Sequence, residues 1–330
     1  MPEAFHRPAD GAVRRGDAPE RGAATTTVRL KCVRCGRAGL RPSPSAYACE
    51  GCGAAFPVVG GVPRFVDSEF YSGSFGFQWT RFARTQLDSA GEERRSRETF
   101  FDKTGWTTEA LAGRSVLDAG CGMGRFAEVC ADAGADVHGV DLSRAVEAAA
   151  ANLRDRPNVR VYQADIMNLP FADASFDFIY SIGVLHHTPS TQAAFGRLPR
   201  LLKPNGQLAV WVYSTRLRAL AGSLLLRRVT PYLPERWLLG ACRLAIPLYH
   251  VHRLPVVGRV TSVLLPTSLH PLPEWRWLDT FDWYAPRFQW KHTFEEVEGW
   301  FRDAGLVDVT RGAFPVSVLG TRPVPAGSGA

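Results

Sequence analysis

The stretch Val116-Leu117-Asp118-Ala119-Gly120-Cys121-Gly122-Met123-Gly124 decides the fold of this 330-residue chain. It begins as a short apolar run, which is typical of a buried strand, and leads directly into three alternating glycines. Glycine lets the backbone turn sharply and approach a ligand closely. A helix is expected directly afterwards, over residues 125–133. The stretch therefore predicts a strand, a ligand-binding turn and a helix.

Short apolar runs and helical stretches alternate on both sides of this turn. The regular alternation predicts an α/β fold built on a parallel sheet. The expected strands are 116–120, 136–141, 159–165, 176–182 and 207–214. The chain is expected to close with a helix over 294–305 and a strand pair over 306–311 and 314–321.

Polar residues come directly after the expected strands. Asp141 ends the second strand, where a carboxylate can hold ribose hydroxyls, and Asp165 ends the third, where it can receive an adenine amino group. The fourth strand leads into Ser181-Ile182-Gly183. Ligands bind at the carboxyl edge of open α/β sheets, so these residues and the glycine turn predict a nucleoside site.

At this point the sequence resembles the class I S-adenosylmethionine (SAM)-dependent methyltransferases. The glycine turn is similar to their first motif, and a dinucleotide-binding enzyme would instead show G-x-G-x-x-G, in which the third glycine comes one residue later. The matching segments are VLDAGCGMGRF (116–126), VHGVDLS (137–143), QADIMNLPF (163–171), FDFIYSIGVLHH (176–187) and RLLKPNGQLAV (200–210).

The resemblance implies a Rossmann-like sheet of seven strands with an antiparallel last strand, and SAM as the cofactor. It also implies which residues hold that cofactor. Asp118 and the glycine turn would face its amino acid portion, Asp141 its ribose and Asp165 its adenine, with Phe171 in reach of the adenine. The implied cofactor-binding residues are Asp118, Gly120, Cys121, Gly122, Gly124, Asp141, Leu142, Asp165, Ile166, Ser181 and Gly183.

Three histidines are candidate bases for methyl transfer to an oxygen or carbon acceptor, because histidine is the side chain suited to proton transfer at neutral pH. His187 is favoured over its neighbour His186, since related small-molecule methyltransferases place a polar residue at that point of the loop. His292 follows an aromatic run and is the third candidate. The alternative is that these histidines only hydrogen-bond the loop. An N- or S-methyl acceptor needs no protein base.

Four cysteines form two C-x2-C pairs before the sheet, separated by thirteen residues. Two such hairpins can complete a tetrahedron of thiolates around Zn²⁺ without an open position, so the ion would be structural. Disulfides are the alternative, but the odd total of seven cysteines opposes them. We expect loss of the ion to loosen this segment and spare the sheet. The predicted ligands are Cys32, Cys35, Cys49 and Cys52.

The composition is that of an ordinary globular protein, with 45% hydrophobic and 22% charged residues and a net charge of +7. No stretch offers the roughly 20 uninterrupted apolar residues of a membrane span. The first residues lack the apolar core of a secretory signal, and the cysteine usage suits a reducing compartment. We therefore expect a cytoplasmic protein without a membrane span.

Changes in composition divide the chain into six expected segments. These are a disordered leader (1–27), a zinc ribbon (28–66), a helical connector (67–110), the SAM-binding Rossmann-like core (111–214), a helical lid insertion (215–290) and the closing helix and strand pair (291–325).

The insertion is rich in arginine and tryptophan, and it is the segment expected to determine which methyl acceptor binds. One interpretation is a lid with solvated arginines. A second is a lid over a hydrophobic or anionic acceptor, with Arg216, Arg218, Arg227 or Arg228 contacting phosphate. A third is recognition of RNA by basic and aromatic side chains.

Three functions remain open from the sequence. The favoured one is methyl transfer to a small molecule or biosynthetic intermediate. The second is an rRNA or tRNA base methyltransferase that uses the zinc ribbon for docking, although Ser181-Ile182-Gly183-Val184 stands where an amino-group methyltransferase would show an N/D-P-P-Y motif. The third is a SAM-binding partner protein without turnover.

Overall fold

The computed structural model describes residues 28–68, 71–91, 94–215 and 221–325. The expected leader (1–27) and the candidate phosphate contacts Arg216 and Arg218 lie outside the described residues. Within that part of the chain, no helix combines the length and the apolar character needed to cross a bilayer.

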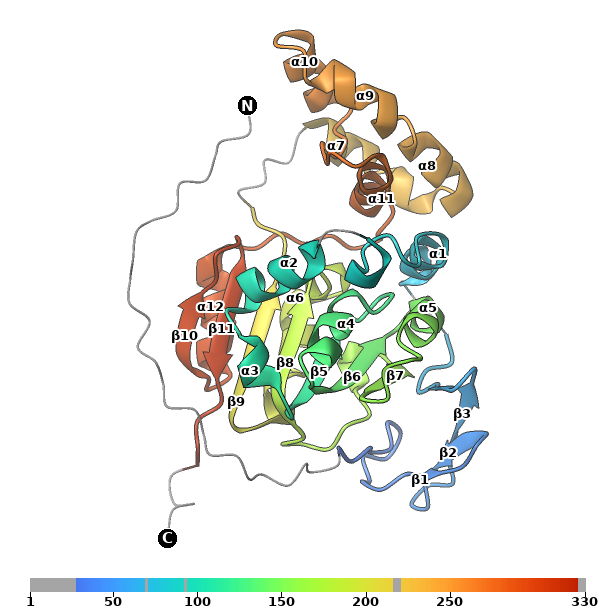
Figure 1. Ribbon diagram of the computed structural model, residues 1–330, viewed down its shortest axis with the longest axis vertical. Coiled ribbons are helices and arrows are strands. Elements are labelled where there is room, and N and C mark those ends of the chain that lie inside the picture. Colours follow the sequence, from blue (N-terminus) through green and yellow to red (C-terminus); the bar gives the residue numbers. More distant parts are fainter. Residues whose placement is uncertain (1–27, 69–70, 92–93, 216–220, 326–330) are drawn as a thin grey trace.

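A seven-stranded sheet forms the centre of the molecule (Figure 1). Its strand order is β10-β11-β9-β8-β5-β6-β7, and only β11 runs antiparallel to its neighbours. This confirms the predicted Rossmann-like sheet. The strands are β5 (Ser115–Ala119), β6 (Asp136–Asp141), β7 (Val159–Gln163), β8 (Phe176–Ile182), β9 (Leu202–Trp211), β10 (Val307–Arg311) and β11 (Ser317–Thr321).

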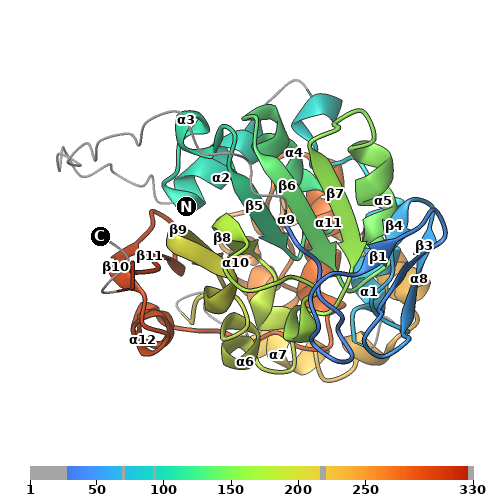
Figure 2. The same cartoon turned by 90° about the horizontal axis from the view of Figure 1, so that it is seen from below.

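Helices cover both faces of the sheet, which is why β5 is buried along its whole length. Figure 2 shows the two layers from below, with α2 to α5 on one side and α6 and α12 on the other. The first layer contains α2 (Arg95–Thr104), α3 (Thr108–Leu111), α4 (Arg125–Asp132) and α5 (Ala145–Asn152). The second contains α6 (Thr191–Phe195) and α12 (Phe294–Asp303).

The cysteine-rich segment folds into a small antiparallel sheet beside β7 (Figure 2). Its apolar side chains do not form a core of their own: Phe56 and Phe65 are buried in the same cluster as Tyr162 and Phe171 of the central domain. The four strands are β1 (Arg41–Pro42), β2 (Ala46–Ala48), β3 (Ala55–Val59) and β4 (Val62–Pro63).

Backbone hydrogen bonds continue from this segment into the central domain. The Phe65 N–H donates to the Gln163 carbonyl at 2.8 Å, and the Lys31 N–H donates to the Pro170 carbonyl at 2.9 Å. The amide of Asn168 donates to the Val33 carbonyl at 2.9 Å. The segment is therefore built onto the edge of β7 and onto the loop that follows it.

The insertion is a stack of helices above the carboxyl edge of the sheet (Figure 1). Of these, α11 packs between the other helices and the central domain, and its Leu278 and Phe281 are fully buried. The helices are α7 (Ala221–Leu226), α8 (Glu235–Cys242), α9 (Ala245–His252), α10 (Val257–Leu264) and α11 (Pro273–Tyr284).

Candidate functional site

The glycine turn joins β5 to α4 as the sequence predicts. Gly120, Gly122 and Gly124 have φ of +100°, +52° and +94°, a left-handed region that favours glycine. A Cβ at Gly120 would lie 2.4 Å from the Val184 side chain, so this approach of two loops requires glycine. The turn therefore brings backbone and the loop after β8 together at the carboxyl edge of the sheet.

Asp141 lies at the end of β6, directly across from this turn. One carboxylate oxygen accepts a hydrogen bond from the Gly122 N–H at 2.9 Å. The other accepts from the backbone and the hydroxyl of Ser143 at 2.8 and 2.7 Å. Burial raises the pKa of Asp141, and these donors oppose the shift by stabilising the carboxylate. The carboxylate is thus held in one orientation at the wall of a cavity.

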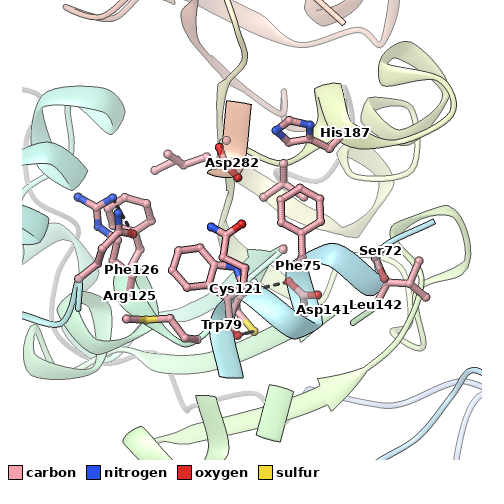
Figure 3. Close-up of a pocket in the computed structure, with 18 of the residues that line it drawn as sticks. Ser72, Phe75, Trp79, Cys121, Arg125, Phe126, Asp141, Leu142, His187 and Asp282 are labelled. Atoms are coloured by element: carbon pink, nitrogen blue, oxygen red, sulfur yellow. Dashed lines mark hydrogen bonds between the residues drawn. The ribbon is translucent and has the colours of Figure 1, made fainter. Parts of the chain in front are cut away.

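A cavity of about 270 Å³ opens above the turn (Figure 3). Cys121 and Asp141 lie at one side of it, and His187 and Asp282 lie at the other. Its wall includes these side chains together with Tyr71, Phe75, Trp79, Lys103, Gly120, Gly122, Arg125, Leu142, Ile166, Gly183, Trp211, Tyr213 and Asp279.

Helix α1 (Gly73–Arg81) forms part of this wall, and the sequence analysis missed it. Phe75 and Trp79 face the cavity from α1, and a Cβ at Gly122 would lie 3.2 Å from the indole nitrogen of Trp79. The signal was present in the aromatic spacing of Phe75, Trp79 and Phe82, which repeats at three to four residues.

The predicted cofactor residues divide into two groups. Those that line the cavity are Gly120, Cys121, Gly122, Asp141, Leu142, Ile166 and Gly183. Those that the structure places outside its wall are Asp118, Gly124, Asp165 and Ser181.

The second group has local structural roles. Gly124 starts α4, and the Ser181 hydroxyl donates to the Ala119 carbonyl at 2.7 Å. Asp165 caps a short 3₁₀ helix by accepting from the Met167 N–H at 2.9 Å. Phe171, expected near the adenine, is fully buried against Tyr162 and belongs to the core. These residues shape the elements that carry the cavity wall.

Asp118 is buried near the carboxyl end of β5, where one carboxylate oxygen has no hydrogen-bond partner among the described residues. Burial raises its pKa to about 8, because the charged form would lose its hydration. Burial therefore favours the protonated form of this carboxyl more than it is favoured in an exposed aspartate.

His187 is the candidate base that faces the cavity (Figure 3). Its Nδ1 lies 2.8 Å from the Phe288 carbonyl, which can only accept, so Nδ1 carries the proton and Nε2 has the lone pair. The Phe75 ring packs against the imidazole, with ring centroids 5.1 Å apart. Burial lowers the pKa of His187, so the ring is neutral at pH 7.

The other two candidate histidines do not line the cavity. His186 is fully buried between the rings of His187 and Tyr213, and neither ring nitrogen has a partner in the described residues. His292 binds the Thr191 hydroxyl at 2.9 Å through Nε2 and lies 3.4 Å from Glu296. Their contacts position the loops around His187.

Charged side chains of both signs line the cavity. The Lys103 ammonium lies 3.4 Å from the centre of the Trp211 ring, and burial lowers its pKa. Arg125 donates to the Ser96 hydroxyl at 2.9 Å, while Asp282 accepts from the Tyr213 hydroxyl at 2.9 Å. Burial and the neighbouring Asp282 raise the pKa of Asp279 to about 6.

The four predicted metal ligands come together within the cysteine-rich segment. Their sulfur atoms all lie within 4.8 Å of one another, with 3.7 Å between Cys32 and Cys52 and 3.6 Å between Cys35 and Cys49. A tetrahedron with Zn–S bonds of about 2.3 Å has edges of about 3.8 Å, so the donor set fits Zn²⁺. The cysteines are not disulfide-bonded.

A protein-family model described as a methyltransferase domain matches residues 117–210. The core of this chain belongs to the class I SAM-dependent methyltransferases. This match supports SAM as the cofactor, as the sequence predicts.

Three curated relatives show how far the similarity extends. Methyltransferase GfsG of Streptomyces halstedii is 36% identical over 129 residues, which cover 38% of this chain and 44% of the relative. Demethylmenaquinone methyltransferase of Renibacterium salmoninarum is 35% identical over 126 residues, covering 38% and 51%. Malonyl-[acyl-carrier protein] O-methyltransferase of Pectobacterium atrosepticum is 38% identical over 100 residues, covering 30% and 39%. The chain thus spans about half or less of each of these relatives.

Proposed function

We propose that the chain is a SAM-dependent methyltransferase that acts on a small molecule or biosynthetic intermediate. The observation that carries this proposal is the position of His187, whose free Nε2 faces the same cavity as the glycine turn and Asp141. A neutral imidazole in that position can accept the proton of an acceptor hydroxyl. Relatives named for demethylmenaquinone and malonyl-acyl-carrier protein support an acceptor of this class.

The cavity wall fits the cofactor that the family implies. Asp141 offers acceptor oxygens for the ribose hydroxyls, and Leu142 and Ile166 offer apolar surface beside an adenine. The glycine at position 122 also keeps space free in the cavity, because a Cβ there would crowd the Trp79 indole. When bound, SAM supplies an activated methyl group, and the protein's task is to align the acceptor with it and exclude water.

Asp282 lies on the same side of the cavity as His187, and Lys103, Arg125 and Asp279 line other parts of its wall. Buried cations of this kind suit an anionic group, and the rings of Phe75 and Trp211 suit an apolar one. The acceptor is therefore hydrophobic, anionic or both. The fixed Nδ1–Phe288 hydrogen bond keeps His187 in the tautomer that accepts a proton through Nε2.

We further propose that Cys32, Cys35, Cys49 and Cys52 hold a structural zinc ion. All four ligands are thiolates, so no coordination position is open for chemistry. The ion would hold together the two cysteine pairs of a segment whose core is shared with the central domain. Thiolate ligands persist in a reducing compartment, which supports the cytoplasm as the location of the chain.

The first experiment separates cofactor binding from chemistry. Asp141→Ala should weaken binding of S-adenosylhomocysteine by about 1–3 kcal/mol in calorimetry, because buried donors lose their acceptor. His187→Gln should leave this affinity unchanged and slow transfer of labelled methyl to host metabolites about 100-fold or more. The wild-type rate should be flat above pH 6.5 and fall in acid, because protonation removes the base.

Asp155→Ala is the matched control for Asp141, because Asp155 is an exposed carboxylate outside the cavity. Label in an RNA fraction alone would favour the RNA acceptor. Cofactor binding without label in any fraction would favour a SAM-binding partner protein. Equal loss of cofactor affinity in both substitution variants would contradict the assignment of His187 to the chemical step.

A further inference from the structure

The outer surface of the helical insertion is strongly apolar. Most of the large apolar side chains that are exposed in the described residues lie between Leu224 and Leu272. Along α10 they recur at helical spacing, so that one stripe of the helix faces solvent. This stripe consists of Val256, Val257, Val260, Val263 and Leu264, which are between 41% and 75% exposed.

Helix α7 continues this stripe. A Cβ at Gly222 would lie 2.3 Å from the Leu264 carbonyl oxygen, so the two backbones touch where only glycine fits. Leu224 and Leu225 follow directly on α7 and are 58% and 64% exposed. Together these side chains form what we call the α7/α10 surface: Leu224, Leu225, Val256, Val257, Val260, Val263 and Leu264.

The helical segment that carries the α7/α10 surface is strongly basic. Glu235 is the only acidic residue between positions 224 and 272 of the sequence. The exposed arginines of this segment have no carboxylate partner among the described residues, whereas on the central domain Arg156 pairs with Asp132 at 2.9 Å. Tyr232 and Trp237 are also exposed there, at 75% and 69%. The exposed arginines are Arg228, Arg236, Arg243, Arg253 and Arg259.

We propose that the α7/α10 surface docks on an anionic lipid bilayer. The valines and leucines would enter the boundary between headgroups and acyl chains, as the apolar face of an interfacial helix does. The arginines would keep their aliphatic stems in that boundary and place their guanidinium groups among the lipid phosphates. Tyrosine and tryptophan suit the same depth. This inference does not depend on the proposed methyl transfer.

The charges favour a bilayer over a second copy of the chain. A symmetric contact would set the same arginine-rich surface against itself, and the single Glu235 could not compensate the like charges. An anionic bilayer instead presents a negative charge to every arginine at once. Because α11 lies between the α7/α10 surface and the cavity, the docked insertion would hold the cavity close to the bilayer (Figure 1).

Flotation of the full chain with lipid vesicles tests this inference. We expect the chain to float with vesicles that contain 30% phosphatidylglycerol. With vesicles of pure phosphatidylcholine it should remain in the bottom fraction. Arg253→Gln and Arg259→Gln should each lower partitioning about fivefold, the equivalent of about 1 kcal/mol per arginine. Val263→Ser combined with Leu264→Ser should lower it further by removing apolar contact. Raised salt should weaken the wild-type interaction.

Matched controls come from the central domain. Val307→Ser removes an exposed valine of β10, and Arg154→Gln removes an exposed arginine; neither should change flotation. Equal partitioning of all variants, or no binding to anionic vesicles, would overturn the proposal. So would a dimer in light scattering that Val263→Ser with Leu264→Ser dissociates. Unchanged S-adenosylhomocysteine affinity shows that each variant is folded.

Discussion

Two accessory regions flank the same sheet and use their apolar residues in opposite ways. In the cysteine-rich segment, called the ribbon below, Phe56 and Phe65 are 4% and 6% exposed and share a hydrophobic cluster with the central domain. In the insertion, Val256 and Leu264 are 75% and 62% exposed. The ribbon's apolar side chains stabilise the fold, whereas those of α7 and α10 remain available to another surface.

The two regions also differ in the polar contacts that attach them to the central domain. The ribbon is joined to the loop after β7 by backbone bonds and by the amide of Asn168. The insertion is attached through α11 and the segment after it, where the Tyr213 hydroxyl donates to Asp282 at 2.9 Å and Nδ1 of His187 donates to the Phe288 carbonyl at 2.8 Å. Damage to the ribbon should therefore reach the central domain, while changes on α7 and α10 should not.

The largest effect is expected from Cys49→Ser. Loss of one thiolate should release the proposed zinc ion, and structural zinc sites contribute about 10 kcal/mol of apparent binding energy. The free energy of unfolding should fall by several kcal/mol, and S-adenosylhomocysteine should bind more weakly because the ribbon supports the loop that carries Ile166. Metal analysis, denaturant titration and calorimetry measure these three outcomes.

Cys242→Ala is the control in the insertion, since Cys242 is a buried cysteine of α8 outside the metal cluster. It should keep one zinc ion per chain and the affinity for S-adenosylhomocysteine. A full zinc content in the Cys49 variant would show that the ligand set is wrong. Loss of zinc with an unchanged free energy of unfolding would instead support the expectation from sequence, in which the ribbon loosens without affecting the sheet.

Much of the fold and half of the site follow from local sequence pattern. The glycine turn, Asp141 and the four cysteines are recognisable because their chemistry depends on spacing along the chain, and the structure brings the cysteines together as predicted. Strand β9 begins at Leu202 rather than Gln207, because Phe176 pairs with Leu202 and extends the strand through the proline and glycine that suggest a loop.

What the sequence did not reveal depends on tertiary packing. The positions of Phe75 over His187 and of Lys103 over Trp211 join segments that are far apart in the chain. The core that the ribbon shares with the sheet also depends on a contact between distant segments, because Phe65 of the ribbon packs against Tyr162 of the central domain. The separation of Asp165 from the cavity wall could not be read from its place after a strand, since a cap and a ligand contact look alike in sequence.

An intermediate effect is expected from matched substitutions of apolar residues in the two regions. Phe65→Ala should lower the free energy of unfolding by about 3 kcal/mol, because it leaves a cavity between Phe56 and Tyr162. Val260→Ala should change it by about 0.5 kcal/mol or less, because Val260 is 57% exposed. Denaturant titration of both variants measures the contrast, and equal losses would refute the division between the regions.

The smallest effect is expected at Asp279 of α11, which lines the cavity. Its folded-state pKa of about 6 lies above the usual 3.8, because the site is buried and Asp282 is near. The folded state therefore holds the proton more tightly than the unfolded state. Stability from this group is greatest below pH 4 and falls as the pH rises through about 6.

Asp279→Asn should remove this dependence, since an amide keeps the shape and can still accept from the Ser268 hydroxyl. The variant should match the wild type near pH 4 and exceed it by about 1–2 kcal/mol above pH 6, after allowance for partial exposure. Denaturation curves at several pH values measure the difference. A difference that does not vary with pH would show that Asp279 is solvated, and that the insertion lacks a buried attachment comparable to the ribbon's.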